Sequence, residues 1–365
     1  FFFNMEVGFS EDISLLQLNE HPKPTMMFNS NYPFFTGSSE YMKSHFKNYA
    51  NWIMKNHSTD AKNIIEIGSN DGTFLKNFIS SNINCLGFEP SSNVANVAKK
   101  NGINTLNKFF NTETSSNLKN FNKNTDIICA ANAICHIPDL NNLIAAVDFL
   151  LNKKGLFIFE EPYLGSMFEK TSYDQIYDEH IFLFSVTSIS KIFKLYDMEL
   201  IDVLPQITHG GSMRYVVGRK KIHSIGNNVN KFLQYEKDKN FDNLSSCMSF
   251  KKNCEVSKNK TKESLLEFKS KNYRIVGYAA TSKSTTVLNY CKIDAKMIDF
   301  ICDTTKEKIG KFTPGTHIPI VDMSKFNSSK PDIAYLFAWN HKEEIFKKEK
   351  DFLSHGGKWI SHISI

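Results

Sequence analysis

The chain has 365 residues, of which 41% are hydrophobic and 22% charged, and its formal net charge is +6. These values are ordinary for a globular protein, so they exclude a disordered chain, a collagen and a disulfide-stapled miniprotein. The length predicts two to three domains. Because no apolar run reaches the roughly 18 residues of a membrane-spanning helix, we expect no membrane association.

The seven cysteines are odd in number and form no Cys-x-x-Cys pair. Cys85, Cys129 and Cys302 lie in apolar, strand-like runs, as buried thiols do in a reducing compartment. We therefore expect a cytoplasmic protein without a metal ion, since no spacing matches a zinc site. The positive charge lies mostly after residue 219 and is typical of a solvated helical face. An anionic partner such as a nucleotide diphosphate is the alternative, but no nucleic-acid-binding motif supports a nucleic-acid partner.

The first half of the chain predicts alternating strands and helices. Residues 1–50 show no clear period and predict loops with short helical pieces. From residue 61 onward, strands are predicted at 63–67, 84–89, 103–106, 126–131 and 156–159, and helices at 74–80, from Ser92 and at 140–151. Alternation of this kind predicts an α/β fold with a parallel sheet covered on both faces.

The period breaks at residues 163–185, which are aromatic and charged. It resumes with a helix at 187–195 and strands at 198–204 and 213–217. Residues 220–271 are Lys-rich with helical spacing, and a second series of strands is predicted at 274–278, 297–302, 318–321, 332–337 and 359–360. The chain therefore divides into four predicted regions, namely 1–50, 51–219, a helical connector 220–271 and a smaller α/β domain 272–365.

A polar, glycine-containing turn follows the first of these strands. The strand carries Glu66, and the turn contains Gly68, Asn70, Asp71 and Gly72 before a helix opens. Glycines let a backbone approach a ligand closely, and the carboxyl ends of parallel strands form the usual ligand crevice. The spacing is not Gly-x-Gly-x-x-Gly and no Walker lysine follows, so a pyrophosphate is a poor fit. Carboxylates here favour a cationic or amine-bearing ligand; a plain tight turn is the alternative.

Two further polar motifs follow later strands. Glu89, next to Pro90, ends the second strand 17 residues after Gly72, where an acidic residue can accept both hydroxyls of a ribose. The segment from Asn132 to Asp139, which includes His136, follows the fourth strand and reaches the same edge of the sheet. The alternatives are an exposed glutamate and a helix-entry loop with Asp139 as N-cap.

In this order and spacing, the three motifs resemble a class I S-adenosylmethionine-dependent methyltransferase, with a Rossmann-like sheet. Later motifs resemble the bacterial sugar C-methyltransferases of deoxysugar biosynthesis, from about residue 30 to the C-terminus. They are Glu160-Glu161-Pro162, Tyr177-Asp178-Glu179-His180, the segments 209–214, 277–285 and 289–291, Pro314-Gly315-Thr316-His317-Ile318-Pro319, and Ala338-Trp339-Asn340.

The resemblance implies transfer of a methyl group from S-adenosylmethionine to a carbon next to the keto group of a nucleotide-linked 4-keto-6-deoxysugar. Region 51–219 would bind the methyl donor, and region 272–365 would complete the sugar-nucleotide site. By position, the donor would be held by Glu66, Gly68, Asn70, Asp71, Gly72, Glu89, Pro90 and Asn132. The catalytic candidates that match the family's motifs are Tyr177, Glu179, His180 and His136.

Methylation of carbon needs a base that removes a weakly acidic proton and groups that stabilise the enolate. A neutral histidine suits the base, and we expect His180 in that role, oriented by Glu179. Tyr177 and His136 would donate hydrogen bonds to the oxyanion. If the segment is a strand, residues 179 and 180 point to opposite faces, and Glu179 is then the alternative base.

Two basic segments are candidates for the substrate's diphosphate and sugar hydroxyls. The first offers backbone N–H groups and a cation, and comprises His209, Gly210, Gly211, Ser212 and Arg214. The second opens a helix with Lys283, Ser284 and Thr285, as anion sites at helix N-termini do. The alternatives are a β-turn with an exposed arginine and a plain helix cap.

One feature departs from the family pattern. Family members usually begin with a cysteine-rich zinc domain, but Ser10-Glu11-Asp12-Ile13 stands where a Cys-x-x-Cys pair is expected, and no cysteine precedes Cys85. We expect this domain to be lost or the sequence to be a fragment. Region 1–50 would then contain the tail of that domain and the segment Phe34-Phe35-Thr36-Gly37-Ser38-Ser39, which resembles the family's lid.

Three other functions are weighed against C-methylation. The same scaffold could O-methylate a sugar or another small molecule, or it could be a non-catalytic relative, although intact donor motifs argue against the latter. An NAD-dependent oxidoreductase is excluded by the glycine spacing. The expected partner is a sugar nucleotide, and the sequence carries no signal of oligomeric state.

Overall fold

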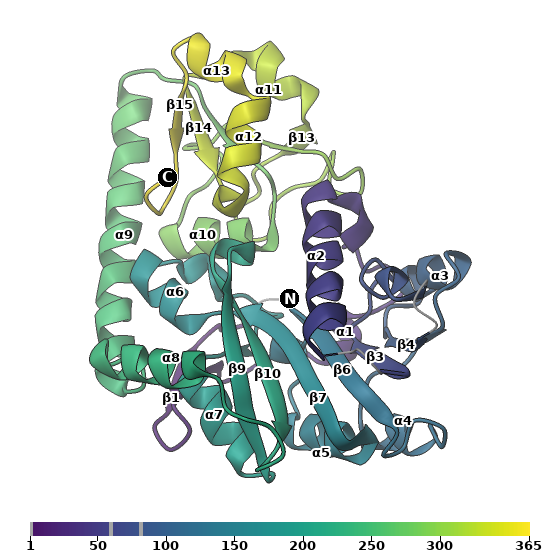
Figure 1. The fold of residues 1–365 in the computed structure, drawn as a ribbon. Helices are drawn as coiled ribbons and strands as arrows, with labels where there is room; N and C mark the ends of the chain where they lie inside the picture. Colours follow the sequence, from purple (N-terminus) through teal and green to yellow (C-terminus); the bar gives the residue numbers. More distant parts are fainter. Residues whose placement is uncertain (1–2, 58–60, 80–82) are drawn as a thin grey trace. The chain divides into compact units, whose positions relative to one another are not determined.

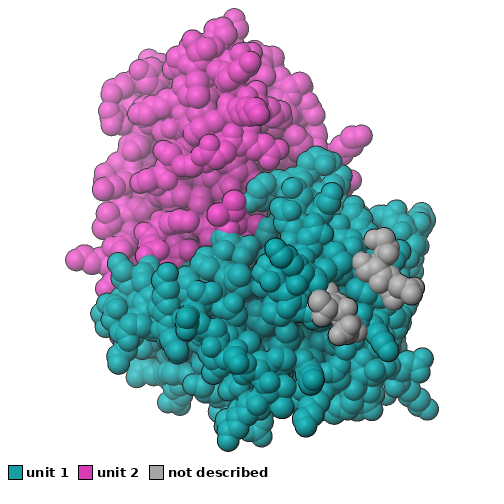
Figure 2. Space-filling model, viewed as in Figure 1, with its two compact units in different colours: residues 1–163, 178–206, 212–242 teal, residues 164–177, 207–211, 243–365 magenta. Residues whose placement is uncertain are grey.

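The computed structural model describes residues 3–57, 61–79 and 83–365 and divides into two compact units (Figure 2). Unit 1 comprises residues 1–163, 178–206 and 212–242, and unit 2 comprises 164–177, 207–211 and 243–365. The chain therefore leaves unit 1 twice to contribute short segments to unit 2 before the C-terminal part begins.

Unit 1 is built on a seven-stranded sheet with the order β5-β4-β3-β6-β7-β10-β9 (Figure 1). Neighbours from β5 to β7 run parallel, whereas β10 is antiparallel to both β7 and β9. The strands are β3 (Asn63–Ile67), β4 (Asn84–Phe88), β5 (Thr105–Leu106), β6 (Thr125–Ala131), β7 (Leu151–Pro162), β9 (Met198–Gln206) and β10 (Ser212–Arg219). The strand order reverses beside β3, so the carboxyl ends of β3 and β6 mark the expected ligand crevice.

Alternating side chains of the central strands build a core on each face of this sheet. Ile64 packs with Phe46 and Tyr49 of α2, whereas its neighbour Ile65 packs with Leu143 of α5. All residues of β3 are buried, as a parallel strand covered on both faces requires. The helices of unit 1 are α1 (Pro24–Met27), α2 (Glu40–His57), α3 (Ser92–Lys100), α4 (Thr112–Ser116), α5 (Leu140–Leu150), α7 (Val186–Lys194) and α8 (Asn227–Asp238).

The N-terminal region contains a hairpin where only loops and short helical pieces were expected. β1 (Val7–Ser10) pairs antiparallel with β2 (Leu15–Leu18), and β2 pairs with β8 (Phe182–Leu183). Four-residue strands are too short to show clear alternation, and the partner strand β8 is distant in sequence. The expectation of loops was therefore wrong for this hairpin. Residues 1–2 of the predicted N-terminal region lie outside the described residues.

The helix expected at 74–80 is instead a single 3₁₀ turn, Leu75–Asn77. Phe74, Leu75 and Phe78 are buried, so tertiary packing rather than helix length accounts for these apolar side chains. Ser80, the last residue of that predicted helix, lies outside the described residues.

Unit 2 is a five-stranded parallel sheet with the order β13-β12-β11-β14-β15. Its strands are β11 (Ile275–Tyr278), β12 (Ile301–Asp303), β13 (Ile320–Asp322), β14 (Ile333–Leu336) and β15 (Lys358–Ile360). Its helices are α6 (Leu164–Lys170), α9 (Leu244–Ser270), α10 (Ser282–Cys291), α11 (Ser324–Ser329), α12 (Lys342–Lys348) and α13 (Lys350–Ser354). The strand order reverses between β11 and β14, which places the crevice of this sheet after those two strands.

The long helix α9 is polar on much of its surface and buries Phe250, Cys254, Thr261 and Leu265. In the part of the chain that the structure describes, neither this helix nor any other combines the length and apolarity needed to cross a bilayer. The predicted mixed α/β fold is confirmed, with a Rossmann-like sheet in unit 1 and a second, smaller α/β sheet in unit 2.

Candidate functional site

The turn after β3 is held in a conformation that requires glycine. Gly68 and Gly72 have φ angles of 70° and 79°, and Asn70 has φ 48°. A Cβ atom on Gly68 would lie 2.7 Å from the Cβ of Ala133, in the loop after β6. The loops after β3 and β6 therefore meet at the point where the strand order reverses.

Two predicted carboxylates organise this turn through the backbone. Glu89 accepts hydrogen bonds from the N–H of Asn70 at 3.0 Å and of Ser91 at 2.7 Å. Asp71 Oδ1 accepts from the hydroxyl of Thr73 at 2.7 Å and from its N–H at 3.2 Å. Burial raises the pKa of Glu89, although its hydrogen bonds oppose that shift. Both carboxylates thus fix the shape of the donor loop, which we define as residues 68–73.

The segment Phe34–Ser39, which resembles a lid, contacts the donor loop. The N–H of Thr36 donates to Asn70 Oδ1 at 2.8 Å, and the N–H of Gly37 donates to Asp71 Oδ2 at 2.7 Å. In return, Asn70 Nδ2 donates to the carbonyl of Phe34 at 3.2 Å. These contacts join two segments more than 30 residues apart in sequence.

Several buried polar atoms near the strand ends lack hydrogen-bond partners, and two of them belong to residues predicted to bind the methyl donor. These two are Oε2 of Glu66 on β3 and Oδ1 of Asn132 after β6. Burial, together with the charges of Asp71 and Glu89, raises the pKa of Glu66 well above its usual range. Pro90 is the remaining residue predicted to bind the methyl donor, and its carbonyl accepts a hydrogen bond from Asn107 Nδ2 at 2.8 Å. Unpartnered buried polar atoms beside a close glycine turn fit a polar ligand such as S-adenosylmethionine.

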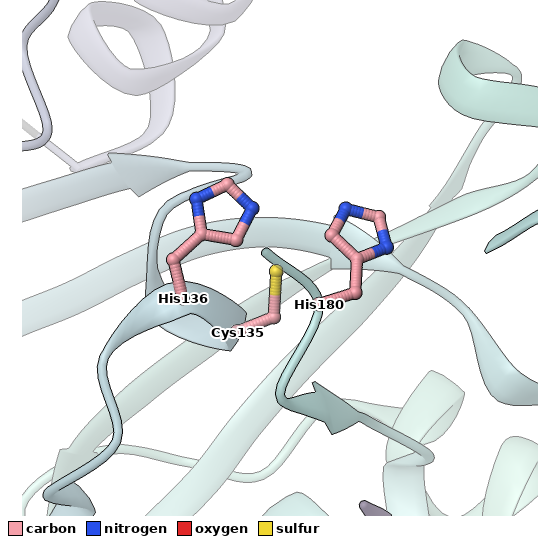
Figure 3. A group of neighbouring side chains, drawn as sticks. All are labelled: Cys135, His136 and His180. Atoms are coloured by element: carbon pink, nitrogen blue, oxygen red, sulfur yellow. The ribbon is translucent and has the colours of Figure 1, made fainter. Parts of the chain in front are cut away.

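His136 and His180 come together from distant parts of the sequence. Their rings stack with centroids 5.4 Å apart (Figure 3). The ring of Phe28 also stacks on that of His136, with the two centroids 5.7 Å apart. Burial lowers the pKa of His136 to about 4, so its imidazole is neutral near pH 7. A neutral imidazole can donate one hydrogen bond and accept another.

Glu179 is paired with a residue that sequence reasoning missed. Tyr32 hydrogen-bonds to Glu179, and burial raises the pKa of the tyrosine well above its usual range. Burial, with the neighbouring Asp178 charge, also raises the pKa of Glu179 to about 7, although the Tyr32 hydrogen bond opposes this. The only available sequence signal was that Tyr32 stands just before the lid-like segment.

The segment containing Tyr177, Glu179 and His180 is a turn rather than a strand. The argument that residues 179 and 180 point to opposite faces holds only for a strand, so it does not apply to this turn. The boundary between the units falls after Tyr177, which belongs to unit 2, whereas Glu179 and His180 belong to unit 1.

Arg214 is committed to a buried ion pair. Its Nε donates to Glu160 Oε1 at 2.7 Å, and its guanidinium lies 3.9 Å from the ring centroid of Tyr49. His45 contacts the other oxygen of Glu160 at 2.6 Å. Burial alone raises the pKa of Glu160, but the His45 hydrogen bond and the Arg214 charge hold it below its usual range. The structure therefore gives Arg214 an internal partner and does not support the expected substrate contact.

In unit 2, the predicted 209–211 segment meets the start of α10. The carbonyl of His209 accepts from Gln175 Nε2 at 2.5 Å and lies 3.4 Å from Lys283 Nζ. Lys283 Nζ also lies 5.4 Å from the ring centroid of Trp339, which follows β14. Burial lowers the pKa of Lys283, and the charge of Asp174 opposes that shift. A cation thus stands at the carboxyl ends of β11 and β14.

The remaining predicted substrate residues have other placements. Gly210 and Gly211 have φ angles of 85° and 128°, and a side chain at Gly210 would collide with Trp339. Ser284 Oγ donates to the carbonyl of Thr281 at 2.6 Å, so its hydroxyl serves the helix start. Ser212 is buried in β10 of unit 1, and Thr285 is half-buried on α10.

Comparisons with known proteins cover most of the chain. A family model described as a methyltransferase domain matches residues 41–203, and one described as a C-methyltransferase C-terminal domain matches residues 207–364. C-methyltransferase NovU of Streptomyces niveus is 29% identical over 303 residues, which are 83% of this chain and 72% of that protein.

Solved structures are similar to about half of the chain. PH0226 protein of Pyrococcus horikoshii has 14% identity and a TM-score of 0.42, over 51% of this chain and 95% of its own. A possible histamine N-methyltransferase of Thermotoga maritima has 19% identity and a TM-score of 0.38, over 50% of this chain and 92% of its own.

The two family models, in sequence order, join a methyl-donor domain to a C-terminal domain found in carbon methyltransferases. They favour C-methylation over O-methylation and over a non-catalytic protein. The predicted resemblance is confirmed: the chain is an enzyme of the class I S-adenosylmethionine-dependent C-methyltransferase family.

Proposed function

We propose that this enzyme methylates a carbon next to the keto group of a nucleotide-linked 4-keto-6-deoxysugar through an enolate. The observation that carries the proposal is a pair of contacts in unit 1. His136 stacks on His180, and Tyr32 hydrogen-bonds to Glu179, the residue before His180. A neutral imidazole, a carboxyl with a pKa near 7 and a phenol are the groups that enolate formation needs.

S-adenosylmethionine would supply an electrophilic methyl group. The donor loop would hold its methionine end, because Gly68 lets the loop after β6 pack against this turn, and Asn132 of that loop offers an unpartnered amide oxygen. Glu89 would accept the ribose hydroxyls with the lone pairs that its backbone donors leave free. Asp71 would fix the loop and the lid-like segment together.

His180 would take the proton from the carbon next to the ketone, as a positioned base in a buried site. The C–H electron pair would become the C=C bond of the enolate while the carbonyl π pair moves to oxygen. The new C–C bond would then form from the enolate carbon to the methyl group as the S–CH₃ bond breaks, with its electron pair left on sulfur. His136 and Tyr32 are neutral donors suited to the oxyanion, because burial disfavours charge on both. Glu179, with a pKa of about 7, would in its protonated form donate to the Tyr32 oxygen, which leaves the phenol proton for the oxyanion.

In unit 2, Lys283 would attract the substrate's diphosphate. Its ammonium stands at the point where the strand order reverses, beside Trp339. Ligands bind at such points in open parallel sheets, and the indole offers an apolar surface to a nucleotide base.

The test uses a thymidine or uridine diphosphate 4-keto-6-deoxysugar in D₂O with S-adenosylhomocysteine. We expect deuterium to enter the carbon next to the ketone by mass spectrometry, and His180→Gln to slow this exchange about 100-fold or more. With S-adenosylmethionine, the product should gain a carbon-bound methyl group by NMR. Methylation at oxygen, without deuterium exchange in the wild-type enzyme, would overturn the proposal.

A further inference from the structure

We propose that Cys135, His136 and His180 form a binding site for Zn²⁺, which competes with the use of His180 as a base. The donor atoms of these three residues all lie within 4.8 Å of one another. Among the described residues, this is the one group of three or more His, Cys or carboxylate side chains that meets that condition. Figure 3 shows the Cys135 sulfur between the two imidazole rings.

The ligand chemistry suits zinc better than calcium or magnesium. Thiolate and imidazole ligands select zinc and other borderline or soft metals, whereas magnesium and calcium prefer oxygen. Ideal Zn–S and Zn–N bonds of about 2.3 and 2.1 Å place tetrahedral ligands roughly 3.5 Å apart. The donor atoms, now within 4.8 Å of one another, would have to approach by about 1 Å to reach this separation.

The backbone already holds the two segments together. The N–H of Ile181 donates to the carbonyl of Cys135 at 3.0 Å, and the N–H of Leu18 donates to the carbonyl of Ile181 at 2.8 Å. Cys135 and His136 lie in one 3₁₀ turn, Ile134–His136. The scaffold is thus built before a metal arrives, which lowers the ordering entropy that binding must overcome.

One buried nitrogen of the cluster makes no hydrogen bond. His136 Nε2 lacks a hydrogen-bond partner, although solvent hardly reaches it. A metal ion would satisfy this nitrogen. The thiol proton of buried Cys135 would pass to Glu161, with which the thiol is hydrogen-bonded, as the Zn–S bond forms. Three protein ligands would leave a fourth position for water.

This site departs from the sequence expectation of no metal ion. Cys135 and His136 are adjacent and His180 lies 44 residues later, so no zinc motif could indicate it. Metal binding itself rests on the geometry alone, whereas the competition with catalysis rests on the proposed role of His180. Zinc would make the enzyme inactive by holding the lone pair that His180 needs to accept a proton.

The first experiment measures metal binding without substrate. Titration of the wild-type chain with Co²⁺ should give a thiolate-to-cobalt charge-transfer band, and Zn²⁺ should displace the cobalt at one equivalent. Cys135→Ser and His180→Asn should each weaken Zn²⁺ binding at least tenfold against a chromophoric chelator. Cys247→Ser, which removes a half-buried thiol on α9, is the matched control and should bind as the wild type does.

X-ray absorption of the zinc-loaded wild-type chain needs no variant and should show one sulfur and two nitrogen neighbours. A folded wild-type chain without the charge-transfer band, or a band that survives Cys135→Ser, would overturn the site. The deuterium-exchange assay separates the second claim, because Zn²⁺ should stop exchange and EDTA should restore it. Exchange that continues in the zinc-loaded enzyme would leave the metal site intact but remove the competition with His180.

Discussion

The backbone N–H of Gly37 donates a 2.7 Å hydrogen bond to Asp71 Oδ2, which ties the lid-like segment to the donor loop. The same carboxylate accepts from Thr73 through its other oxygen. Asp71 therefore links the two segments, and a change in either segment should alter the proposed methyl-donor site.

A methyl group at Gly37 should disturb that site. Its Cβ would lie 2.8 Å from Asp71 Oδ2 and 2.9 Å from Thr73 Oγ1, so the carboxylate must move away from its donors. We expect Gly37→Ala to weaken S-adenosylmethionine binding about tenfold, or ~1.4 kcal/mol, by titration calorimetry. Ser38→Ala changes the exposed neighbour and should bind normally; equal affinity in both variants would contradict this coupling.

Removal of the carboxylate of Asp71 or of Glu89 should also weaken the binding of S-adenosylmethionine. Asp71→Ala and Glu89→Ala leave buried N–H groups without acceptors, at a cost of roughly 1–3 kcal/mol each. We expect affinity for S-adenosylmethionine to fall by between about tenfold and 100-fold. Glu113→Ala removes an exposed acidic side chain from α4 as the charge control. Wild-type affinity in a folded Glu89→Ala protein would exclude Glu89 from the donor site.

Acid should destabilise the fold partly through His136. Burial lowers the pKa of this histidine to about 4, whereas an unfolded histidine binds a proton near pH 6.5. The unfolded state therefore binds more protons between these values, and the stability present above pH 6.5 is lost as the pH falls to about 4. The full effect is roughly 3 kcal/mol.

His136→Phe keeps a ring that can stack between Phe28 and His180 but cannot be protonated. Its free energy of unfolding, measured with urea, should fall less between pH 6.5 and 4 than that of the wild type. His355→Asn removes an exposed histidine as the control. Parallel pH curves for the wild type and His136→Phe would show that His136 is not buried in a neutral form.

Arg214 should matter for stability because Glu160 is buried beside it. Arg214→Ala leaves this carboxylate without its cation and removes the contact with Tyr49, so we expect a loss of about 3–5 kcal/mol in urea denaturation. Adding Glu160→Gln should restore part of that loss, because the uncompensated charge is then gone. If the Arg214→Ala protein were as stable as the wild type, the ion pair would not explain this arginine, and substrate binding would again be its expected role.

Lys283 should act on the substrate's phosphates. Lys283→Met keeps much of the side-chain volume beside Trp339 and removes the charge. We expect binding of uridine or thymidine diphosphate to weaken about tenfold or more, since a charged hydrogen bond contributes roughly 1.5–3 kcal/mol. Lys296→Met, at an exposed position in the same unit, should leave binding unchanged. Equal binding by both variants would remove Lys283 from the proposed phosphate site.

Local patterns in the sequence were enough for the two sheets and the turns at their strand ends. The apolar run at 63–67 became the buried β3, and Asp139 caps α5 by accepting from the N–H of Asn142 at 2.9 Å. Gly68 was expected in a tight turn and has a positive φ. Such features depend on neighbouring residues, so a single sequence contains them. The residue roles at the site stay predictions.

The tertiary structure alone decided which distant side chains meet. Nothing local pairs Tyr32 with Glu179, stacks His136 on His180, or places Glu160 against Arg214 rather than leaving the arginine for a ligand. The short strand β2 likewise pairs with β8, which lies far away in the sequence. These contacts depend on chain segments brought together by burial of the apolar core, which sequence spacing does not record.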